Sequence, residues 1–558
     1  MILNGADITI KLLEELGIKD IIGIPGGANL PLYDSLYKSS IRHILSRHEQ
    51  GAAFIAQGIA RATGRAAVCF ATSGPGATNL LTAIADAKLD SVPIIAITGQ
   101  VPYSMIGTDA FQEVDTYGLT VPITKHNFLV RSIEELFYVI PEAFNIAESG
   151  RPGPVLIDIP KDIQIQNIEY KSCNFLRNQR IKSDLNLALI KEIAEEINRA
   201  KKPILYFGGG IVQSDASEEL KQLSRKSNIP AAATLMALGV FTDDDPLFLG
   251  MLGMHGARYT NYIIDEADLL LAFGCRFDDR AIGNSEKFCP NAKVIHIDID
   301  EAEVNKIRNA HLSIGGDLKD ILEAMIPYIN WDTREKWIDF VLKMKIENPF
   351  TLPDKDDLFH PINIIKFVGG SVPEDAIIAT DVGQHQMWTA QAYPFKLPRT
   401  LLTSGGLGTM GFGLPAAIGA SLAFPNRTVI CFSGDGSILM NIQELATMAD
   451  LDLNVKVLIM NNGHLGLVRQ QQEMFYEKHY IASKFKTNPN FSVISEGFGI
   501  KGYNLSLEKN PLKTLEKLLT EPGCCVIDIP IRQEENVLPI VPPGAGNTEM
   551  IGGGYYGK

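Results

Sequence analysis

Short apolar runs alternate with amphipathic segments along most of this 558-residue chain. Residues 155–159, 204–207, 269–273 and 294–297 are mostly apolar runs of strand length, whereas residues 8–16 repeat apolar positions at helical spacing. Strands that are apolar on both faces are typical of parallel sheets covered by helices on both sides. We therefore predict an α/β fold of doubly wound parallel-sheet domains.

Length and two polar segments divide the chain into three such domains. At roughly 150 residues per domain, the length suggests three or four domains. Residues 169–184 and 348–359 are mostly polar and lack a regular period, which is typical of linkers. The predicted segments are a domain over residues 1–165, a linker over 166–185, a central domain over 186–345, a linker over 346–360, a domain over 361–535 and a C-terminal tail over 536–558.

Composition narrows the possible partners. The net charge is -14 and basic clusters are missing, which argues against nucleic acid as a partner. The longest uncharged span, residues 400–426, contains six Gly and two Pro, so it fits a loop and helix better than a membrane span. The acid-containing amphipathic N-terminus lacks secretory or transit features, and the seven Cys are scattered without a CxxC pair. We expect a cytoplasmic protein with buried thiols.

A glycine turn at residues 434–436 joins a predicted strand over 428–432 to a predicted helix over 438–449. A second buried run follows at residues 455–460. A glycine turn at a helix N-terminus lets backbone N–H groups approach a phosphate. Asp435 would repel that phosphate unless a divalent cation lay between them, so Asp435 is a candidate Mg²⁺ ligand.

Asn462 ends the next predicted strand, and neighbouring parallel strands deliver their carboxyl ends to one edge of the sheet. The sequence GDG, followed by 24 residues and then two Asn, resembles the thiamine diphosphate motif. The resemblance implies that Asp435, Asn462 and the backbone carbonyl of His464 bind Mg²⁺. It also implies that residues 361–535 bind the diphosphate and that residues 1–165 bind the pyrimidine ring.

The segment RHEQ at residues 47–50 precedes an apolar helix. Taken alone, Glu49 fits the acid preferred at a helix N-terminus. In thiamine enzymes such a segment holds the glutamate that activates the cofactor, because a carboxyl at N1′ stabilises the imino tautomer that removes the C2 proton. Since Glu49 and Asp435 lie in different domains, the cofactor has to bridge them. In the family this bridge crosses a subunit interface, which implies a homodimer or a tetramer.

Several further segments resemble acetohydroxyacid synthase, also called acetolactate synthase. They are GIPGG at 23–27, TSGPGATN at 72–79, DAFQE at 109–113, KHNFLV at 125–130 and RPGPVLIDIPKD at 151–162. With the tail segment VPPGAGNTEM at 541–550, which resembles the family's active-site cover, the resemblance extends over essentially the whole chain. It implies that the substrate is handled by Gly27, Phe111, Gln112, Lys161 and Gln471, in addition to Glu49.

The central segment carries a second nucleotide signature. A predicted strand leads into three glycines at 208–210, and GMLGMHG at 250–256 and GCRFDDR at 274–280 resemble the family's FAD-binding domain. The alternative for 276–280 is a solvated run of charges. The guanidinium group of Arg can donate two hydrogen bonds to a phosphate, and a carboxylate can accept hydrogen bonds from a hydroxyl-rich chain. The resemblance implies FAD contacts from Arg151, Gly208, Gly209, Gly210, Thr234, Leu235, Met254, His255, Gly274, Arg276, Asp278, Arg280, Asp298, Ile299 and Asp317.

The segment GGLGTMG at 405–411 contains a GxGxxG that also fits a nicotinamide dinucleotide. That alternative needs an acid about 20 residues later, and the nearest, Asp435, already belongs to the metal turn. In the thiamine family Met410 supports the bent cofactor, although core filling is the commoner role of Met. The thiamine diphosphate contacts implied by the resemblance are Val382, Gly383, Gln384, His385, Gly408, Met410, Gly434, Gly436, Ser437, Leu465, Gly466 and Leu467.

The resemblance as a whole implies a catalytic subunit of an acetohydroxyacid synthase with thiamine diphosphate, Mg²⁺ and a structural FAD. Such an enzyme decarboxylates pyruvate and transfers the hydroxyethyl unit to pyruvate or 2-oxobutyrate, for branched-chain amino-acid biosynthesis, and it usually has a small regulatory subunit. Pyruvate oxidase is the main alternative because it uses both organic cofactors. Pyruvate decarboxylase would need a His pair at Gln112 and Glu113, and a non-catalytic binding protein would tolerate losing Glu49 or Asp435.

Overall fold

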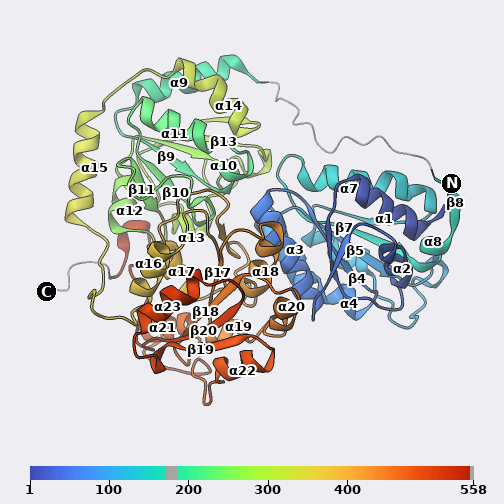
Figure 1. Cartoon of the computed structure of the whole chain (residues 1–558). Helices are drawn as coiled ribbons and strands as arrows, with labels where there is room; N and C mark the ends of the chain where they lie inside the picture. Colours follow the sequence, from blue (N-terminus) through green and yellow to red (C-terminus); the bar gives the residue numbers. More distant parts are fainter. Residues whose placement is uncertain (171–184, 553–558) are drawn as a thin grey trace.

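The computed structural model describes residues 1–170 and 185–552, so most of the expected linker at 166–185 lies outside the described residues. Three six-stranded sheets follow one another along the chain, and all their strand pairs are parallel. Figure 1 shows helices on both faces of these sheets, with the first domain on the right, the central domain above and the third domain below. The predicted α/β fold of three parallel-sheet domains is therefore confirmed.

The first domain has the strand order β3-β2-β4-β5-β7-β6. Its strands are β2 Asp20–Gly23, β3 Arg42–Leu45, β4 Ala67–Ala71, β5 Ile94–Gln100, β6 His126–Leu129 and β7 Val155–Pro160. Its helices are α1 Gly5–Glu15, α2 Leu30–Tyr37, α3 Glu49–Thr63, α4 Pro75–Asn79, α5 Leu81–Leu89, α6 Thr116–Thr120, α7 Leu136–Glu148 and α8 Lys161–Ile165. The expected linker begins with ordered structure, because β8 Asn167–Glu169 pairs antiparallel with β1 Ile2–Asn4 and so satisfies its backbone.

The central domain has the strand order β11-β10-β9-β12-β13-β14. Its strands are β9 Pro203–Phe207, β10 Ala231–Ala233, β11 Phe248–Met251, β12 Leu269–Phe273, β13 Lys293–Asp298 and β14 Leu312–Gly315. Its helices are α9 Leu187–Arg199, α10 Gly209–Gln213, α11 Ser217–Lys226, α12 Arg258–Asp265, α13 Asp279–Ile282, α14 Leu318–Met325 and α15 Glu335–Glu347. Three of its strands, β9, β12 and β13, coincide closely with apolar runs read from the sequence, since both faces of each strand are buried.

The third domain has the strand order β16-β15-β17-β18-β20-β19. Its strands are β15 Ile377–Thr380, β16 Leu401–Leu402, β17 Val429–Gly434, β18 Val455–Asn461, β19 Lys501–Asn504 and β20 Cys525–Pro530. Its helices are α16 Pro361–Ser371, α17 Gln384–Ala392, α18 Gly413–Ala423, α19 Asp435–Ile438, α20 Glu444–Asp450, α21 Gly466–Phe475, α22 Phe491–Gly497 and α23 Pro511–Thr520.

The single helix predicted over residues 438–449 is wrong. Helix α19 ends at Ile438 and α20 begins only at Glu444. Between them the Asn441 side chain donates to the backbone oxygen of Gly411 at 2.8 Å. This tertiary bond holds residues 439–443 out of the helix, although their apolar spacing fits one.

Helices α3 and α18 lie side by side between the first and third domains (Figure 1). A Cβ atom at Gly58 would lie 2.2 Å from the backbone oxygen of Ala416, and one at Gly419 would lie 2.1 Å from that of Ile55. Glycine at both positions therefore lets the two helix backbones touch. This contact fixes the first domain, including the start of α3, against the third.

The described part of the tail runs from the third domain to the central domain. The Val541 N–H donates to the backbone oxygen of Met254 at 2.9 Å, and Asn547 Nδ2 donates to that of Ala281 at 2.8 Å. The tail thus packs beside α12 and α13, next to segments that the resemblance assigns to FAD. Its expected role as an active-site cover stays a prediction.

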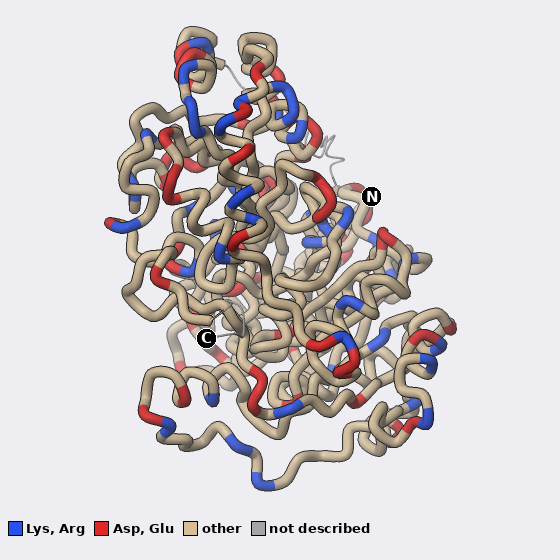
Figure 2. The backbone as a smooth tube through the Cα atoms, turned by 90° about the vertical axis from the view of Figure 1, so that its left-hand side faces the viewer, with Lys and Arg blue, Asp and Glu red and all other residues tan. Residues whose placement is uncertain are grey.

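Charged positions of both signs are interspersed over the molecule, as Figure 2 shows. Among residues 1–170 and 185–552, no helix combines the length and apolar character that a membrane crossing requires.

Candidate active site

Four loops meet at the carboxyl edge of the third sheet, after its neighbouring strands β16, β15, β17 and β18. Ser437 Oγ donates to the backbone oxygen of Val382 at 2.8 Å. A Cβ atom at Gly434 would lie 3.0 Å from the His385 ring, and one at Gly466 would lie 2.1 Å from Gln384 Oε1. The structure therefore brings together the residues that the resemblance assigns to the diphosphate, at the edge where α/β sheets bind ligands.

The oxygen atoms expected to bind Mg²⁺ lie in the same place. Asp435 Oδ2 accepts from the Gly463 N–H at 2.8 Å, while Asn462 Oδ1 accepts from the His464 N–H at 3.0 Å. Burial raises the pKa of Asp435 to about 6, against hydrogen bonds from Asn488 and the backbone. A bound cation would offset the cost of this buried carboxylate. Asp435 is the only acidic member of this group, and no cluster of three or more His, Cys, Asp or Glu suited to a metal occurs among the described residues.

The diphosphate loops have the features of a phosphate cradle. The His385 Nε2 atom is buried and has no hydrogen-bond partner among the described residues. Burial lowers the pKa of His385 to about 3, so a neutral ring offers this nitrogen as a hydrogen-bonding group. A Cβ atom at Gly436 would lie only 2.9 Å from the Leu465 side chain. The glycine turns present therefore fit a bound diphosphate, and the unpartnered His385 nitrogen lies among the loops that would hold it.

The loop that carries Met410 is fixed by backbone hydrogen bonds. The Gly411 N–H donates to Asp381 Oδ1 at 2.8 Å. Gly408 has φ +69°, which favours glycine, and a Cβ atom there would lie 3.9 Å from the Val382 side chain. Burial raises the pKa of Asp381 to about 6, although bonds from Val382 and Gly411 lower it. The loop thus adjoins the diphosphate loops.

Glu49 is the first residue of α3 and is buried. Its Oε2 atom accepts from Asn79 Nδ2 at 2.9 Å. Among the described residues, no hydrogen bond joins Glu49 to the thiamine loops of the third domain. Its neighbours contact the third domain instead: the Arg47 N–H donates to Glu444 Oε1 at 3.0 Å, and Gln50 Oε1 accepts from Asn441 Nδ2 at 3.4 Å.

The expected substrate residues lie at the carboxyl edge of the first sheet, as Glu49 does. Gly27 follows β2, Phe111 and Gln112 follow β5, and Lys161 follows β7. Phe111 is 87% exposed. Gln471 is also exposed, on α21 in the third domain, and no described hydrogen bond links it to the other four. The structure therefore gathers four of these residues and leaves Gln471 apart from them.

The residues that the resemblance assigns to FAD follow the strands of the central sheet. Two glycine turns touch there, since a Cβ atom at Gly274 would lie 2.6 Å from the Cα of Gly210. Thr234 and Leu235 follow β10, Met254 and His255 follow β11, Gly208 and Gly209 follow β9, Arg276, Asp278 and Arg280 follow β12, Asp298 and Ile299 lie at the end of β13, and Asp317 follows β14. Arg151 approaches from the first domain, and its Nη1 pairs with Asp300 Oδ2 at 3.0 Å.

This central edge also fits its expected ligand. Burial raises the pKa of Asp298 to about 6. The nearby His296 Nδ1 atom is buried without a partner among the described residues, while the Arg280 side chain is 67% exposed. Burial lowers the pKa of His255 to about 4. Exposed guanidinium groups beside partly unsatisfied buried groups suit a molecule with phosphates and hydroxyls.

Known proteins resemble this chain throughout. The thiamine pyrophosphate enzyme N-terminal TPP binding domain, central domain and C-terminal TPP binding domain match residues 3–119, 190–325 and 381–529. The acetolactate synthase isozyme 1 large subunit of Escherichia coli (strain K12) is 55% identical over 98% of each chain. Acetolactate synthase 1, chloroplastic, of Nicotiana tabacum is 44% identical over 98% of this chain and 85% of its own. The chain belongs to the acetolactate synthase family of thiamine pyrophosphate enzymes.

Family membership accounts for the convergence of the third-domain loops, but some site residues carry no family signature in the sequence. Asn79 lies at the end of a segment that the resemblance had already marked, whereas Asn488 and His296 lie in none. Asn488 Nδ2 donates to Asp435 Oδ2 at 3.0 Å from a loop before α22. Only the folded chain brings that amide, 53 residues away in sequence, to the expected metal ligand.

Proposed function

We propose that this chain is the catalytic subunit that converts two pyruvate molecules into 2-acetolactate and carbon dioxide, and pyruvate with 2-oxobutyrate into 2-aceto-2-hydroxybutyrate. The observation that carries the proposal is the meeting of four loops after β16, β15, β17 and β18, in a chain 55% identical to an acetolactate synthase large subunit. When bound, thiamine diphosphate supplies the electron sink for decarboxylation. Glu49 would hold the proton at N1′ of its pyrimidine ring.

Product analysis tests this function. The purified protein is incubated with pyruvate, Mg²⁺, thiamine diphosphate and FAD, and the products are quantified. One acetolactate and one carbon dioxide per two pyruvates support the proposal. Oxygen consumption with acetate or acetyl phosphate as the product would favour the pyruvate oxidase alternative instead.

Magnesium and FAD complete the proposed cofactor set. Asp435, Asn462 and the His464 carbonyl would hold Mg²⁺ between the protein and the diphosphate. Arg276 and Arg280 would bind the phosphates of FAD, and Asp298 its hydroxyl-rich chain. Because the proposed reaction has no net redox change, FAD would serve as a structural group. Flavin absorbance of the purified protein, and its loss in Arg276→Ala, test the assignment.

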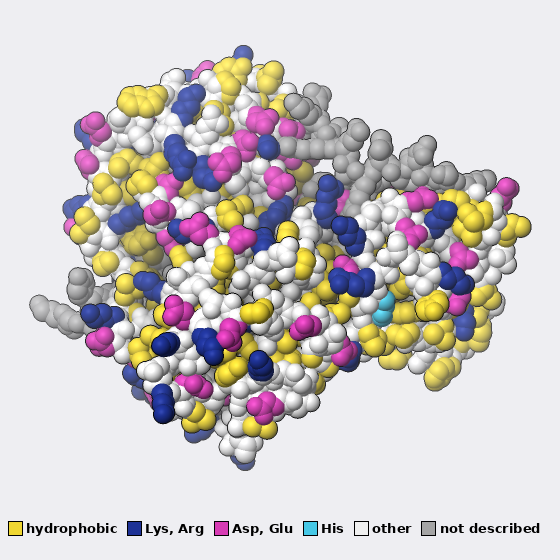
Figure 3. All heavy atoms as spheres, in the orientation of Figure 1, with side chains coloured by type: hydrophobic (Ala, Val, Ile, Leu, Met, Phe, Trp, Pro, Cys, Tyr) yellow, Lys and Arg dark blue, Asp and Glu magenta, His cyan; other side chains and the backbone are white. Residues whose placement is uncertain are grey.

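The complete site would require two chains. Figure 3 shows hydrophobic side chains gathered along the lower edge of the first domain. Phe111, Met440 and Val468, which adjoin expected site residues, are 87%, 52% and 43% exposed. Burial of these side chains against a second copy would stabilise a homodimer, or a tetramer built from dimers. The relatives named large subunits support a small regulatory partner as well.

Gln471 would set the acceptor preference. Most members of the family carry Trp at this position, where the indole forms an apolar wall against the extra methyl group of 2-oxobutyrate. Gln471 offers little apolar surface, so this chain would use pyruvate and 2-oxobutyrate as acceptors with little preference. It belongs, in this respect, to the isozyme I-like type.

A further inference from the structure

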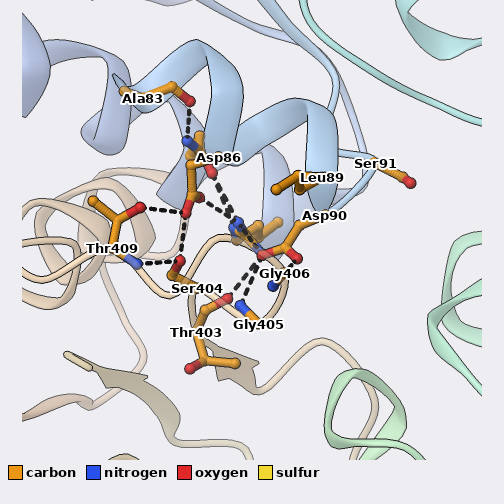
Figure 4. Close-up of polar contacts among 12 residues, drawn as sticks. Ala83, Asp86, Leu89, Asp90, Ser91, Thr403, Ser404, Gly405, Gly406 and Thr409 are labelled. Carbon is orange, nitrogen blue, oxygen red and sulfur yellow. Dashed lines mark hydrogen bonds and ion pairs between the residues drawn. The ribbon is translucent and has the colours of Figure 1, made fainter. Parts of the chain in front are cut away.

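A buried cluster of charges joins the first domain to the loop that carries Met410. Figure 4 shows Asp86 and Asp90, at the end of α5, facing the loop over residues 403–409. Arg61 Nη2, from α3, pairs with Asp86 Oδ2 at 3.0 Å and with Asp90 Oδ2 at 2.8 Å. The side chains of both acids are 0% exposed, and that of Arg61 is 6% exposed. None of these three residues belongs to the expected contacts of either cofactor.

The two acids hold the loop through its own donors. The N–H groups of Gly405 and Gly406 donate to the two Asp90 oxygens at 2.9 and 2.7 Å. Ser404 Oγ donates to Asp86 Oδ1, which also accepts from Thr409 Oγ1 at 3.0 Å. These bonds fix both ends of a loop whose glycines have no side chains with which to anchor themselves.

The stability of α5 itself does not explain the buried charges of Asp86 and Asp90. An acid at a helix C-terminus opposes the helix dipole, and Asp90 is the residue that ends α5. Asp86 and Asp90 also lie four residues apart on one helix, so they repel each other, and burial adds a desolvation cost. Arg61 and the loop donors offset these costs. The main effect of these charges is therefore to order the loop over residues 403–409.

We propose that Asp90, together with Asp86 and Arg61, is a positioning residue that sets the cofactor-facing loop over residues 405–411 for thiamine diphosphate. The proposal rests on the proposed thiamine-dependent function. Arg61 extends the same restraint, since its Nη1 donates to the Thr403 oxygen at 3.0 Å and its guanidinium lies 4.9 Å from the Phe412 ring centre. Met410 lies between these fixed points. The first domain thus positions the loop over residues 405–411 of its own chain, and this role is separate from that of Glu49.

The same helix end contacts the central domain. Leu89 O accepts from Arg276 Nη1 at 2.5 Å, and Ser91 O accepts from Gln213 Nε2 of α10 at 3.1 Å. The end of α5 therefore holds groups of all three domains. The Asp90 side chain binds Arg61 and the loop over residues 405–411 but no described group of the central domain, so its substitution changes the loop and leaves the central-domain contacts in place.

Asp90→Asn tests the proposal. An asparagine has nearly the same size, but its single carbonyl oxygen cannot serve Gly405, Gly406 and Arg61 together, and its amide hydrogens meet donors. We expect the affinity for thiamine diphosphate, titrated at fixed Mg²⁺, to fall about tenfold or more, which corresponds to about 1.4 kcal/mol. At saturating cofactor, the bound cofactor should exchange its C2 proton for deuterium about tenfold more slowly, while the KM for pyruvate stays near that of the wild type.

Asp245→Asn is the matched control. The Asp245 side chain is 8% exposed, pairs with Arg225 and accepts from the Leu247 N–H at 3.0 Å, all within the central domain. Cofactor affinity and C2 exchange should stay at wild-type values in this variant. Equal losses in both variants, or wild-type affinity and exchange in Asp90→Asn, would overturn the proposal.

Ser404→Ala tests the same proposal if Asp90→Asn does not fold. It keeps all three buried charges and removes only the hydroxyl between Asp86 and the Thr409 N–H, which donates to Ser404 Oγ at 2.8 Å. A threefold or larger loss of cofactor affinity supports the proposal, and an unchanged affinity refutes it. These readouts concern the cofactor alone. Product analysis of the wild type therefore tests the proposed function independently.

Discussion

At the scale of single residues, Asp435 is a buried carboxylate among loops that otherwise suit an anion. Without a cation, the carboxylate and a diphosphate would repel each other. We expect Asp435→Ala to lose Mg²⁺-dependent binding of thiamine diphosphate by about 100-fold or more, because a charged ligand of the metal is removed. Titration of the cofactor at several Mg²⁺ concentrations measures this.

Asn488→Ala is the matched control for that experiment, since it removes only neutral hydrogen bonds, to Asp435 and to Asn461. Its effect should be about tenfold or less. Circular dichroism should show both variants folded. Mg²⁺-dependent activity that is unchanged in Asp435→Ala would contradict the metal assignment.

Asp158 links the folded state to pH. It is buried on β7 and accepts from Thr98 Oγ1 at 2.7 Å and Gln100 Nε2 at 2.9 Å. Burial raises its pKa from 3.8 to about 6, against those two bonds. Because the pKa of Asp158 is higher in the folded state than in the unfolded state, its favourable contribution to the free energy of unfolding is complete below about pH 4. That contribution is lost as the pH rises through about 6.

Asp158→Asn should therefore gain stability relative to the wild type between pH 4 and 7, by up to about 3 kcal/mol. The free energy of unfolding of both proteins, from denaturant titrations at each pH, measures this difference. A difference that does not change with pH over this range would show that Asp158 titrates normally.

Gln471 permits a direct test of acceptor choice. We expect Gln471→Trp to raise the selectivity for 2-oxobutyrate over pyruvate, because one methylene in an apolar pocket is worth roughly 10- to 200-fold. Competition between the two acceptors, with the pyruvate-only rate as the control, measures the ratio. A wild-type selectivity of tens for 2-oxobutyrate would mean that Leu467 or Met474 already forms the wall.

At the scale of elements, the crossing of α3 and α18 depends on glycine. Gly58→Ala would place a methyl group 2.2 Å from a backbone oxygen, so the helices have to separate. We expect a loss of about 1 to 3 kcal/mol or more in the free energy of unfolding, with weaker binding of thiamine diphosphate. Thermal unfolding and cofactor titration measure both effects.

Gly370→Ala, in α16, is the control because nothing lies within 4 Å of the added methyl group. It should be neutral or more stable by up to about 1 kcal/mol. If Gly58→Ala behaved in the same way, close contact of the two helices would not hold the domains together.

The sequence predicts the elements that are buried on both faces, and with them the loops that follow. The runs before Gly208, Gly274 and Asp435 were identifiable because a strand buried on both faces is apolar throughout. Positions that depend on contacts between distant elements were not. The helix expected at 438–449 is interrupted by a bond to Gly411, and the cluster around Arg61 joins α3, α5 and the loop over residues 403–409, whose local patterns do not show that they meet.

At the scale of the whole molecule, the described contacts leave the site in two parts. Glu49, Gly27, Phe111, Gln112 and Lys161 lie at the edge of the first sheet, while Asp435, Gln471 and the diphosphate loops lie in the third domain. Exposed apolar side chains adjoin both parts. If two chains assemble the site, Glu49 of one chain serves the metal site of its partner, and the two halves can be inactivated separately.

Mixing two inactive variants tests this arrangement. Glu49→Gln and Asp435→Ala chains are purified, dissociated together and allowed to reassemble. In a mixed dimer with a two-fold axis, one site then carries both defects and the other carries none. Random pairing makes half of the dimers mixed, so about a quarter of the wild-type activity should return. Mixing Glu49→Gln with Glu49→Ala, whose defects fall on the same half, should restore nothing. A site built within one chain would give no recovery in either mixture, because every site would then keep one of the two defects.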